Sequence, residues 1–139
     1  MKSGLNNLKF RKHHIVYLNH NKVTQKSFKL NYGTFGIQAC ESGNLLAKQI
    51  EAIRKVIRRT TGKKTKFCIN VYPYHPVTKK PVAVRMGKGK GSHSHWVIPV
   101  KKGQILYEIN LSNYRTGLLA FNKAKKKLPI KTKPQIFLY

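Results

Sequence analysis

Acidic residues are almost absent from this sequence. Only Glu41, Glu51 and Glu108 face 29 lysines and arginines, aspartate does not occur, and the net charge is +26 over 139 residues. Acid–base hydrolysis needs a carboxylate beside a second carboxylate or a histidine, and these three glutamates lie far apart in the sequence. We therefore expect a protein that is not an enzyme and has no catalytic residue.

Cysteine is scarce as well. The sequence has two cysteines, Cys40 and Cys68, and neither belongs to a C-x-x-C pair. This number is too small for a disulfide framework, and the histidines lack the spacing of zinc ligands. The two isolated cysteines therefore indicate a reducing compartment. Because the positive charge of the chain also opposes cation binding, we expect no metal, and we expect no cofactor.

Long apolar runs are missing. No stretch approaches the ~18 apolar residues of a membrane-spanning helix, and the first residues, MKSGLNNLKFRKHH, lack the apolar centre of a secretory signal. We expect no membrane insertion.

The excess of positive charge is the dominant feature that is present. Uncompensated like charges repel one another in the folded state, and a polyanion relieves that repulsion. Nucleic acid is the leading candidate, and an anionic membrane surface is the alternative. RNA is preferred over duplex DNA because the two expected helices carry wide apolar stripes that commit them to packing rather than to a DNA groove.

Hydrophobic periodicity predicts one α+β domain. In the first helix Leu46, Ile50, Ile53 and Ile57 share a face. Ser42 or Asn44 would cap its start, and Gly62 would end it. The expected helices cover residues 45–61 and 113–128. The second helix would have Ser112 as its cap and would bury Leu118, Phe121, Ala124 and Leu128. The expected strands cover residues 27–40, 66–76, 81–86, 95–100, 103–110 and 130–139.

A glycine-rich stretch, RMGKGKG, lies between two of the expected strands. It is not a phosphate-binding loop of the Walker type, since no helix follows it. Glycines at alternate positions let the backbone approach a sugar–phosphate surface, and Arg85 adds a planar fork suited to phosphate. Residues 77–93 would form an extended hairpin with Trp96 anchoring its base, opposite His93 and His95. The candidate contact residues of the loop are Arg85, Met86, Gly87, Lys88, Gly89, Lys90 and Gly91.

Other basic residues are candidates for phosphate contact. They flank the loop, avoid the apolar stripe of the first helix, or form the patch KFRKHH near the N-terminus. The candidate RNA-binding residues are Lys9, Arg11, Lys12, His13, His14, Lys48, Lys55, Arg58, Arg59, Lys79 and Lys80.

Several tyrosines stand among the basic residues and are candidates for stacking on unpaired bases. Core packing is the favoured interpretation for Tyr32 and Tyr72. Tyr74 and His75, placed between two prolines, are predicted to lie on the surface.

The ordered motifs LKFRKHH, YGTFGIQACESG, KQIEAIRKVIRR, RMGKGKG, ILYEI and KLPIKTK resemble the large-subunit ribosomal protein sixteen family over about residues 8–133. The resemblance implies an α/β hammerhead-like fold, a mixed or antiparallel sheet packed with two helices, and binding to large-subunit rRNA. It also implies that the loop from Arg85 to Gly91 reaches toward the peptidyl transferase centre, where it helps to position aminoacyl-site tRNA. Neighbouring large-subunit proteins would be further partners, and no homo-oligomer is expected.

The chain departs from the family pattern after His14, where glycine and arginine usually follow and this sequence reads IVYLNHNKVTQK. Residues 1–27 are polar, basic and without a steady apolar period, so we interpret them as a basic N-terminal arm and residues 28–139 as a single ribosomal-protein domain. The abundance of lysine, asparagine, isoleucine and tyrosine suggests an A+T-rich gene. This favours a mitochondrial ribosome encoded in the organelle, with a plastid or the bacterial cytoplasm as alternatives.

Overall fold

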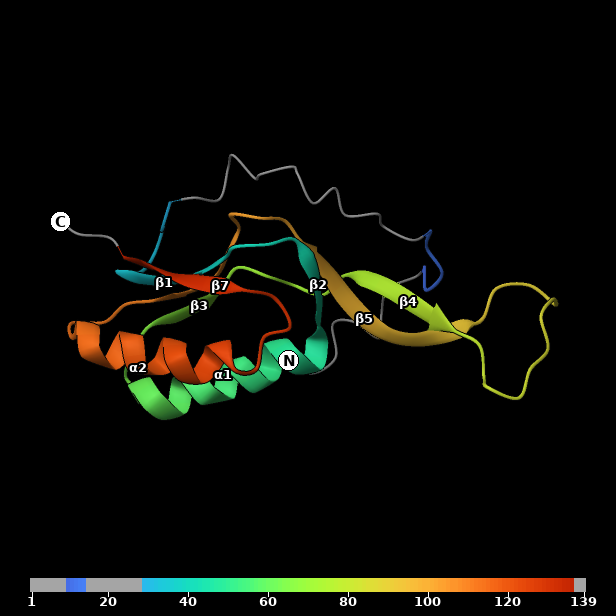
Figure 1. Cartoon of the computed structure of the whole chain (residues 1–139). Coiled ribbons are helices and arrows are strands. Elements are labelled where there is room, and N and C mark those ends of the chain that lie inside the picture. The colour runs from blue at the N-terminus through green and yellow to red at the C-terminus, as the bar shows by residue number, and fades with distance from the viewer. Residues whose placement is uncertain (1–9, 15–28, 137–139) are drawn as a thin grey trace.

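Two antiparallel sheets and two helices make up the computed structural model, which describes residues 10–14 and 29–136 (Figure 1). The first sheet has the strand order β3-β6-β1-β7, and the second has the order β2-β5-β4. In chain order the elements are β1 (Phe35–Ala39), β2 (Gly43–Leu46), α1 (Ala47–Thr61), β3 (Phe67–Ile69), β4 (His75–Lys79), β5 (Ser92–Val100), β6 (Ile105–Ile109), α2 (Tyr114–Lys125) and β7 (Thr132–Ile136). The predicted α+β class is confirmed.

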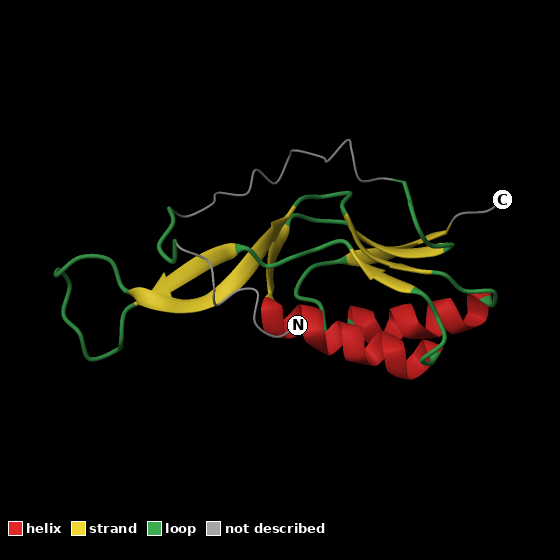
Figure 2. Cartoon of the chain, turned by 180° about the vertical axis from the view of Figure 1, so that it is seen from behind, coloured by secondary structure: helices red, strands yellow, loops and turns green. Residues whose placement is uncertain are grey.

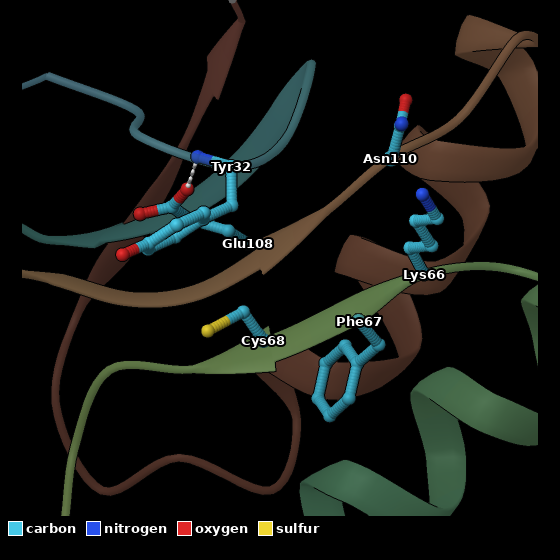
Figure 3. Close-up of a pocket in the computed structure, with 6 residues that line it drawn as sticks. All are labelled: Tyr32, Lys66, Phe67, Cys68, Glu108 and Asn110. Atoms are coloured by element: carbon cyan, nitrogen blue, oxygen red, sulfur yellow. Dashed lines mark hydrogen bonds between the residues drawn. The ribbon is translucent and has the colours of Figure 1, made fainter.

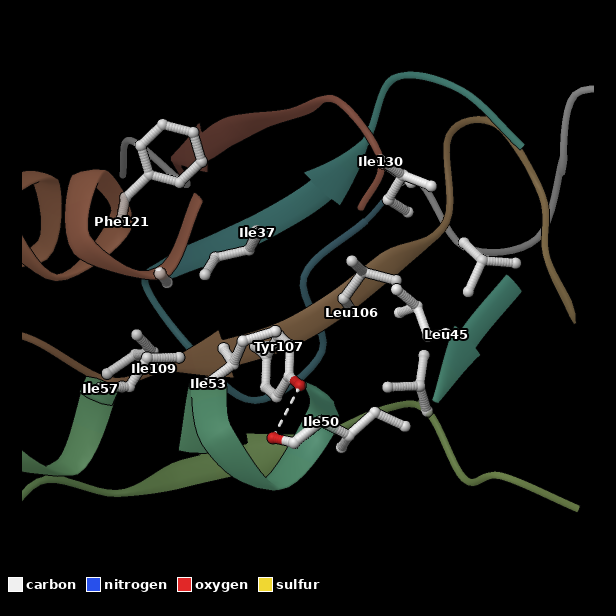
Figure 4. Close-up of a cluster of buried hydrophobic side chains, with 14 of the residues drawn as sticks. Ile37, Leu45, Ile50, Ile53, Ile57, Leu106, Tyr107, Ile109, Phe121 and Ile130 are labelled. Atoms are coloured by element: carbon white, nitrogen blue, oxygen red, sulfur yellow. Dashed lines mark hydrogen bonds between the residues drawn. The ribbon is translucent and has the colours of Figure 1, made fainter. Parts of the chain in front are cut away.

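The four-stranded sheet is built on β1 and β6, in which every residue is buried. The two helices lie side by side along one face of this sheet (Figures 1 and 2). Ile50, Ile53 and Ile57 of α1 meet the sheet in the main hydrophobic core, where Tyr107 also lies (Figure 4). The Tyr107 hydroxyl donates to the Ile50 carbonyl at 3.2 Å, and burial raises the pKa of this phenol. The sheet and the helix layer are therefore joined by packing and by a buried hydrogen bond.

Helix α1 has the predicted buried face, but its start differs from the prediction. Leu46 is the N-cap residue, and its backbone N–H donates to the Gln49 side chain at 2.9 Å. Ser42 and Asn44 are not caps, because residues 43–46 pair with β5 as strand β2. The predicted end is confirmed: Gly62 follows the helix with φ 85° and donates to the Arg58 carbonyl at 3.0 Å.

Helix α2 is capped by Asn113, whose side chain accepts from Arg115 N at 3.0 Å, so the prediction of Ser112 is one residue off. Phe121 and Ala124 are buried as predicted, while Leu118 is half-buried. The helix ends at Lys125, before Leu128 and Pro129, and Leu128 packs on the core from the following turn. The strand predicted after it, at residues 130–139, is present as β7 at the edge of the four-stranded sheet.

The second sheet carries a long hairpin that projects from the body of the molecule (Figure 1). Strands β4 and β5 form its arms, and residues 80–91 form the connection. Two strand predictions are wrong here. Residues 66–76 do not form one strand but contribute to β3 and β4 in different sheets, and residues 81–86 form an exposed loop rather than a strand.

The substitution Ile53→Ala tests whether the apolar face of α1 is part of the core. We expect Ile53→Ala to lower the free energy of unfolding by about 2–5 kcal/mol, because it removes buried methyl groups and leaves a cavity. Ile53 has no exposed surface, whereas Lys55 on the same helix is exposed. Urea denaturation of Ile53→Ala beside Lys55→Ala measures the difference. Equal midpoints for both variants and the wild type would contradict the assignment of this face to the core.

Candidate nucleic-acid interface

Residues 10–14 of the basic arm lie beside the hairpin that ends in the glycine-rich loop, although the two segments are far apart in the sequence (Figures 1 and 2). Lys12 Nζ donates to the Lys90 carbonyl at 3.4 Å, and Lys90 Nζ donates to the His13 carbonyl. The His13 ring meets the His75 ring of β4 edge-on, with the centroids 5.7 Å apart. We name residues 10–14 and 79–91 the arm–hairpin surface. Lys9, the first predicted residue of the arm, lies outside the described residues.

The loop of this surface is open to solvent. Every residue from Pro81 to Lys90 is exposed, and Val82 and Met86 at 98% and 97% are almost fully so. Gly87 and Gly89 have φ values of 106° and 79°, a region that side chains disfavour. Lys80 Nζ donates to the Gly87 carbonyl at 2.5 Å and so braces the turn. The loop therefore presents Arg85 and Lys88 outward on a defined backbone.

No acidic side chain balances this surface, because all three glutamates are engaged elsewhere. Glu51 binds the Arg54 guanidinium through both carboxylate oxygens, at 2.7 and 2.9 Å, and this contact lowers the pKa of Glu51 to about 2. Glu41 accepts from the backbone N–H of Lys131 at 2.7 Å. Glu108 is buried in β6. The partners of Glu51 and Glu41 are thus an arginine side chain and a backbone amide.

Two histidines of the hairpin, His75 and His93, contribute little positive charge. His75 is 8% exposed, so the prediction of a surface contact is wrong. Burial lowers its pKa, with smaller effects from His13 and Lys90. Burial also has the largest lowering effect on the pKa of His93, and the nearby Arg11 and His95 lower that pKa further. Both imidazoles are therefore neutral near pH 7.

Trp96 is buried at the base of the hairpin, as predicted, but it does not lie opposite His93. The two rings are in contact, with centroids 4.6 Å apart. Thr78 pairs with His93 and Val77 with His95, so Ser94 is an extra residue in β5. Such a bulge breaks the two-residue alternation on which the prediction rested.

The predicted basic residues of α1 form a separate region on the helix layer, away from the hairpin (Figure 1). Lys48, Lys55 and Arg59 are exposed. Arg58 instead closes the helix end, because its Nη1 donates to the carbonyls of Lys63 and Thr65 at 2.8 and 3.0 Å.

Helix α2 adds basic residues that sequence reasoning missed. A hollow of about 380 Å³ between the helices, which we name the helix groove, is lined by Val56, Arg59, Thr60, Lys123, Lys126 and Lys127. The run KAKKK was a visible signal, but the pairing of α2 with α1 was needed to place it beside Arg59.

Two predicted core tyrosines are in fact exposed. Tyr32 is 75% exposed and Tyr72 46%, and both lie outside the strands in which they were expected. Tyr74 is 52% exposed, as predicted. Exposed aromatic rings among basic residues suit contact with unpaired bases.

Within residues 10–14 and 29–136, the histidine, cysteine and glutamate side chains form no group of three or more that could hold a metal ion. No helix in these residues has the length and apolar character needed to cross a membrane.

Comparison with known proteins identifies the family. The profile of the family described as Ribosomal protein L16p/L10e matches residues 5–135. The chain is 44% identical over 124 residues to the large ribosomal subunit protein uL16 of Buchnera aphidicola subsp. Acyrthosiphon pisum (strain Tuc7), covering 89% of both chains. It is 43% identical over 124 residues, with the same coverage, to the protein of that name from Buchnera aphidicola subsp. Cinara cedri (strain Cc). The chain therefore belongs to the L16p/L10e family of ribosomal proteins, whose members are structural components of the large subunit and not enzymes.

Proposed function

We propose that this chain, as a structural component of the large ribosomal subunit, binds rRNA through the arm–hairpin surface and the helix groove. The convergence of the arm on the loop carries the proposal: Lys12, Lys90 and His13 are joined by hydrogen bonds, which bring basic residues of the two segments close together. A preformed array of cations releases many counterions from an RNA at once. Neighbouring large-subunit proteins are further proposed partners, and the chain acts as one copy rather than as a homo-oligomer.

The roles of the individual basic residues follow from their positions. Arg11, Lys12, His13 and His14 of the arm and Lys79 and Lys80 of the hairpin contact rRNA beside the loop. Lys48, Lys55 and Arg59 contact rRNA from the helix layer, and Arg58 supports the end of α1. We keep the division into an arm, residues 1–27, and a domain, residues 28–139, with the arm serving as a second RNA-binding segment.

The loop tip is proposed to contact aminoacyl-site tRNA. Arg85 and Met86 are exposed, at a distance from the packed body that the two hairpin strands provide (Figure 2). A guanidinium on an extended loop reaches a phosphate that the body of the protein cannot approach. The loop therefore contacts the incoming tRNA through Arg85 and Met86, while its lysines and the rest of the arm–hairpin surface contact rRNA.

Replacing Arg85 tests this division. We expect Arg85→Ala to slow tRNA accommodation about tenfold or more, because a hydrogen bond to a charged group contributes about 1.5–3 kcal/mol. Arg85→Lys keeps the charge but loses the planar fork, so its accommodation rate is expected to lie between the rates of Arg85→Ala and the wild type. Single-turnover accommodation kinetics on purified subunits measure the effect, and the yield of assembled subunits measures the control. Normal tRNA selection combined with failed assembly would contradict the proposal.

A free-standing RNA-binding factor is the second candidate function, since the same charge would serve it. Sedimentation separates the two. A ribosomal constituent stays with the large subunit through moderately high salt, whereas a factor is released. Loss of the chain from the subunit fraction in a stepwise salt wash, at salt that leaves other subunit proteins bound, would favour the factor.

We place the ribosome in a mitochondrion on the strength of the lysine-, asparagine- and isoleucine-rich composition. The relatives named above are bacterial, which supports the bacterial cytoplasm as the alternative. Locating the gene decides between these and the plastid: a gene on a mitochondrial genome supports the first, and a gene on a plastid genome or a bacterial chromosome overturns it.

A further inference from the structure

The one buried carboxylate of this acid-poor sequence holds a bend of the backbone. Glu108 is 1% exposed, and its Oε2 accepts from the backbone N–H groups of Asn31, Tyr32 and Gly33 at 2.9, 2.7 and 3.2 Å. Its Oε1 accepts from Asn70 Nδ2 at 2.6 Å. Hydrogen bonds to an ionised group are about twice as strong as neutral ones. The bend at residues 31–33 is therefore tightly fixed.

The bend also lies very close to β6. A Cβ at Gly33 would stand 2.7 Å from the Ile109 carbonyl oxygen, so only glycine fits there. The segment is thus pressed against β6 by its shape and bonded to it through Glu108. Yet the side chain at its centre, Tyr32, is 75% exposed. The fold fixes the backbone of this tyrosine without burying its ring.

The Tyr32 ring borders a hollow of about 360 Å³, which we name the Tyr32 hollow (Figure 3). Figure 3 shows the ring lying across Glu108, with Cys68 on the neighbouring strand β3. Lys66 and Asn110 rise at the opposite end and are both exposed. The volume lies in the range of about 300–1,000 Å³ typical of small-ligand sites. The lining residues are Tyr32, Lys66, Phe67, Cys68, Glu108 and Asn110.

The chemistry of the hollow suits a flat ring with a polar edge and a nearby negative charge. Tyr32 offers an aromatic face, the Asn110 amide can both donate and accept, and the Lys66 ammonium attracts an anion. Glu108 does not repel an anion strongly, since four donors already surround its oxygens. A nucleotide of single-stranded RNA combines these features in one ligand.

We propose that the Tyr32 hollow binds one unpaired nucleobase of the rRNA. The base stacks on the Tyr32 ring, its edge faces the Asn110 amide, and its phosphate lies toward Lys66. This inference rests on the proposed function, because it takes RNA as the partner. It adds a site on the sheet side of the fold, separate from the arm–hairpin surface and the helix groove.

Binding of the full-length chain to large-subunit rRNA tests the site. Stacking on an aromatic side chain contributes about 1–3 kcal/mol per base, so Tyr32→Ala is expected to weaken binding about 5- to 150-fold. Tyr32→Phe keeps the ring and is expected to bind like the wild type. Tyr114→Ala, which truncates a tyrosine that is 51% exposed on α2, is the matched control and should have little effect.

Two further readouts separate stacking from a structural role. Chemical probing of the bound RNA should show one nucleotide that is protected by wild type and Tyr32→Phe and reactive with Tyr32→Ala. Ultraviolet crosslinking of the wild-type chain in assembled subunits, followed by mass spectrometry, should place a nucleotide adduct on Tyr32 without any substitution. Melting temperatures of the wild type and Tyr32→Ala should agree, because the ring is exposed.

The outcomes distinguish this inference from the function on which it rests. If the wild-type chain binds no rRNA, both fail. If the wild type binds and Tyr32→Ala binds equally well with the same probing pattern, only the nucleobase site is wrong. An equal loss for Tyr32→Phe and Tyr32→Ala would overturn stacking, and a crosslink from Tyr32 to a protein would assign the hollow to a neighbouring subunit protein instead.

Discussion

Replacing Lys12, Lys79, Lys88 and Lys90 together with glutamine is expected to weaken binding to large-subunit rRNA on the order of 10²-fold near 150 mM salt. Each phosphate neutralised by a cation contributes about 0.7–0.9 to the slope of log K against log salt. Removing four contacts should therefore lower that slope by about 3. A salt titration in which binding is monitored by filter retention or fluorescence anisotropy measures both the affinity and the slope.

The matched control removes the same charge from elsewhere on the surface. Lys29, Lys101, Lys102 and Lys133 are all exposed and lie outside the arm–hairpin surface and the helix groove. Their joint replacement by glutamine changes the net charge equally, so it should lower the affinity much less if contact is local. Equal losses in both variants would show that total charge, rather than the arm–hairpin surface, drives binding.

Glu108→Ala is expected to lower the free energy of unfolding by about 3 kcal/mol or more, because hydrogen bonds to a charged group contribute about 1.5–3 kcal/mol each. Four donors lose their acceptor in this variant: three consecutive backbone amides and the Asn70 side chain. Glu108→Gln keeps an oxygen acceptor and should be intermediate. Urea denaturation measures the loss, and hydrogen exchange at residues 31–33 shows whether the bend opens.

Glu51→Ala provides the control for removing a carboxylate. Glu51 pairs with Arg54 on the surface of α1, with relative exposures of 26% and 36%. Exposed ion pairs contribute about 0–1 kcal/mol, so Glu51→Ala should lower the free energy of unfolding much less than Glu108→Ala does. Stability of Glu108→Ala equal to that of Glu51→Ala would contradict the anchoring role of Glu108.

The parts of the fold that follow local rules could be predicted from the sequence. The stripe of Ile50, Ile53 and Ile57 determines which face of α1 is buried, and Gly62 ends the helix because a left-handed residue is needed there. The apolar strand at residues 105–109 is also found where it is expected. Each of these features depends on residues that are close together in the sequence, within one helix or one strand.

The errors occur where pairing in space overrides the local pattern. Residues 43–46 look like the start of a helix but gain backbone partners in β5. Tyr32 alternates like a strand residue, yet the carboxylate of Glu108, 76 positions away, draws its backbone into a bend. Ser94 adds a bulge that no two-residue alternation reveals. Contacts between distant segments decide these positions, and a single sequence does not display such contacts.

The candidate interface shows the same division. The charge excess and the loop at residues 85–91 could be predicted, since composition and alternating glycines depend on the sequence alone. The hydrogen bonds between the arm and Lys90 could not, because they join segments separated by more than 70 residues. The helix groove was missed for the same reason.

A density map of the large subunit that contains this chain shows whether the arm–hairpin surface meets rRNA. We expect rRNA phosphates in direct contact with the basic side chains of this surface, with Lys88 at the loop tip enclosed by RNA. A map in which Lys88 and the arm face bulk solvent, with no nucleic acid beside them, would contradict this expectation.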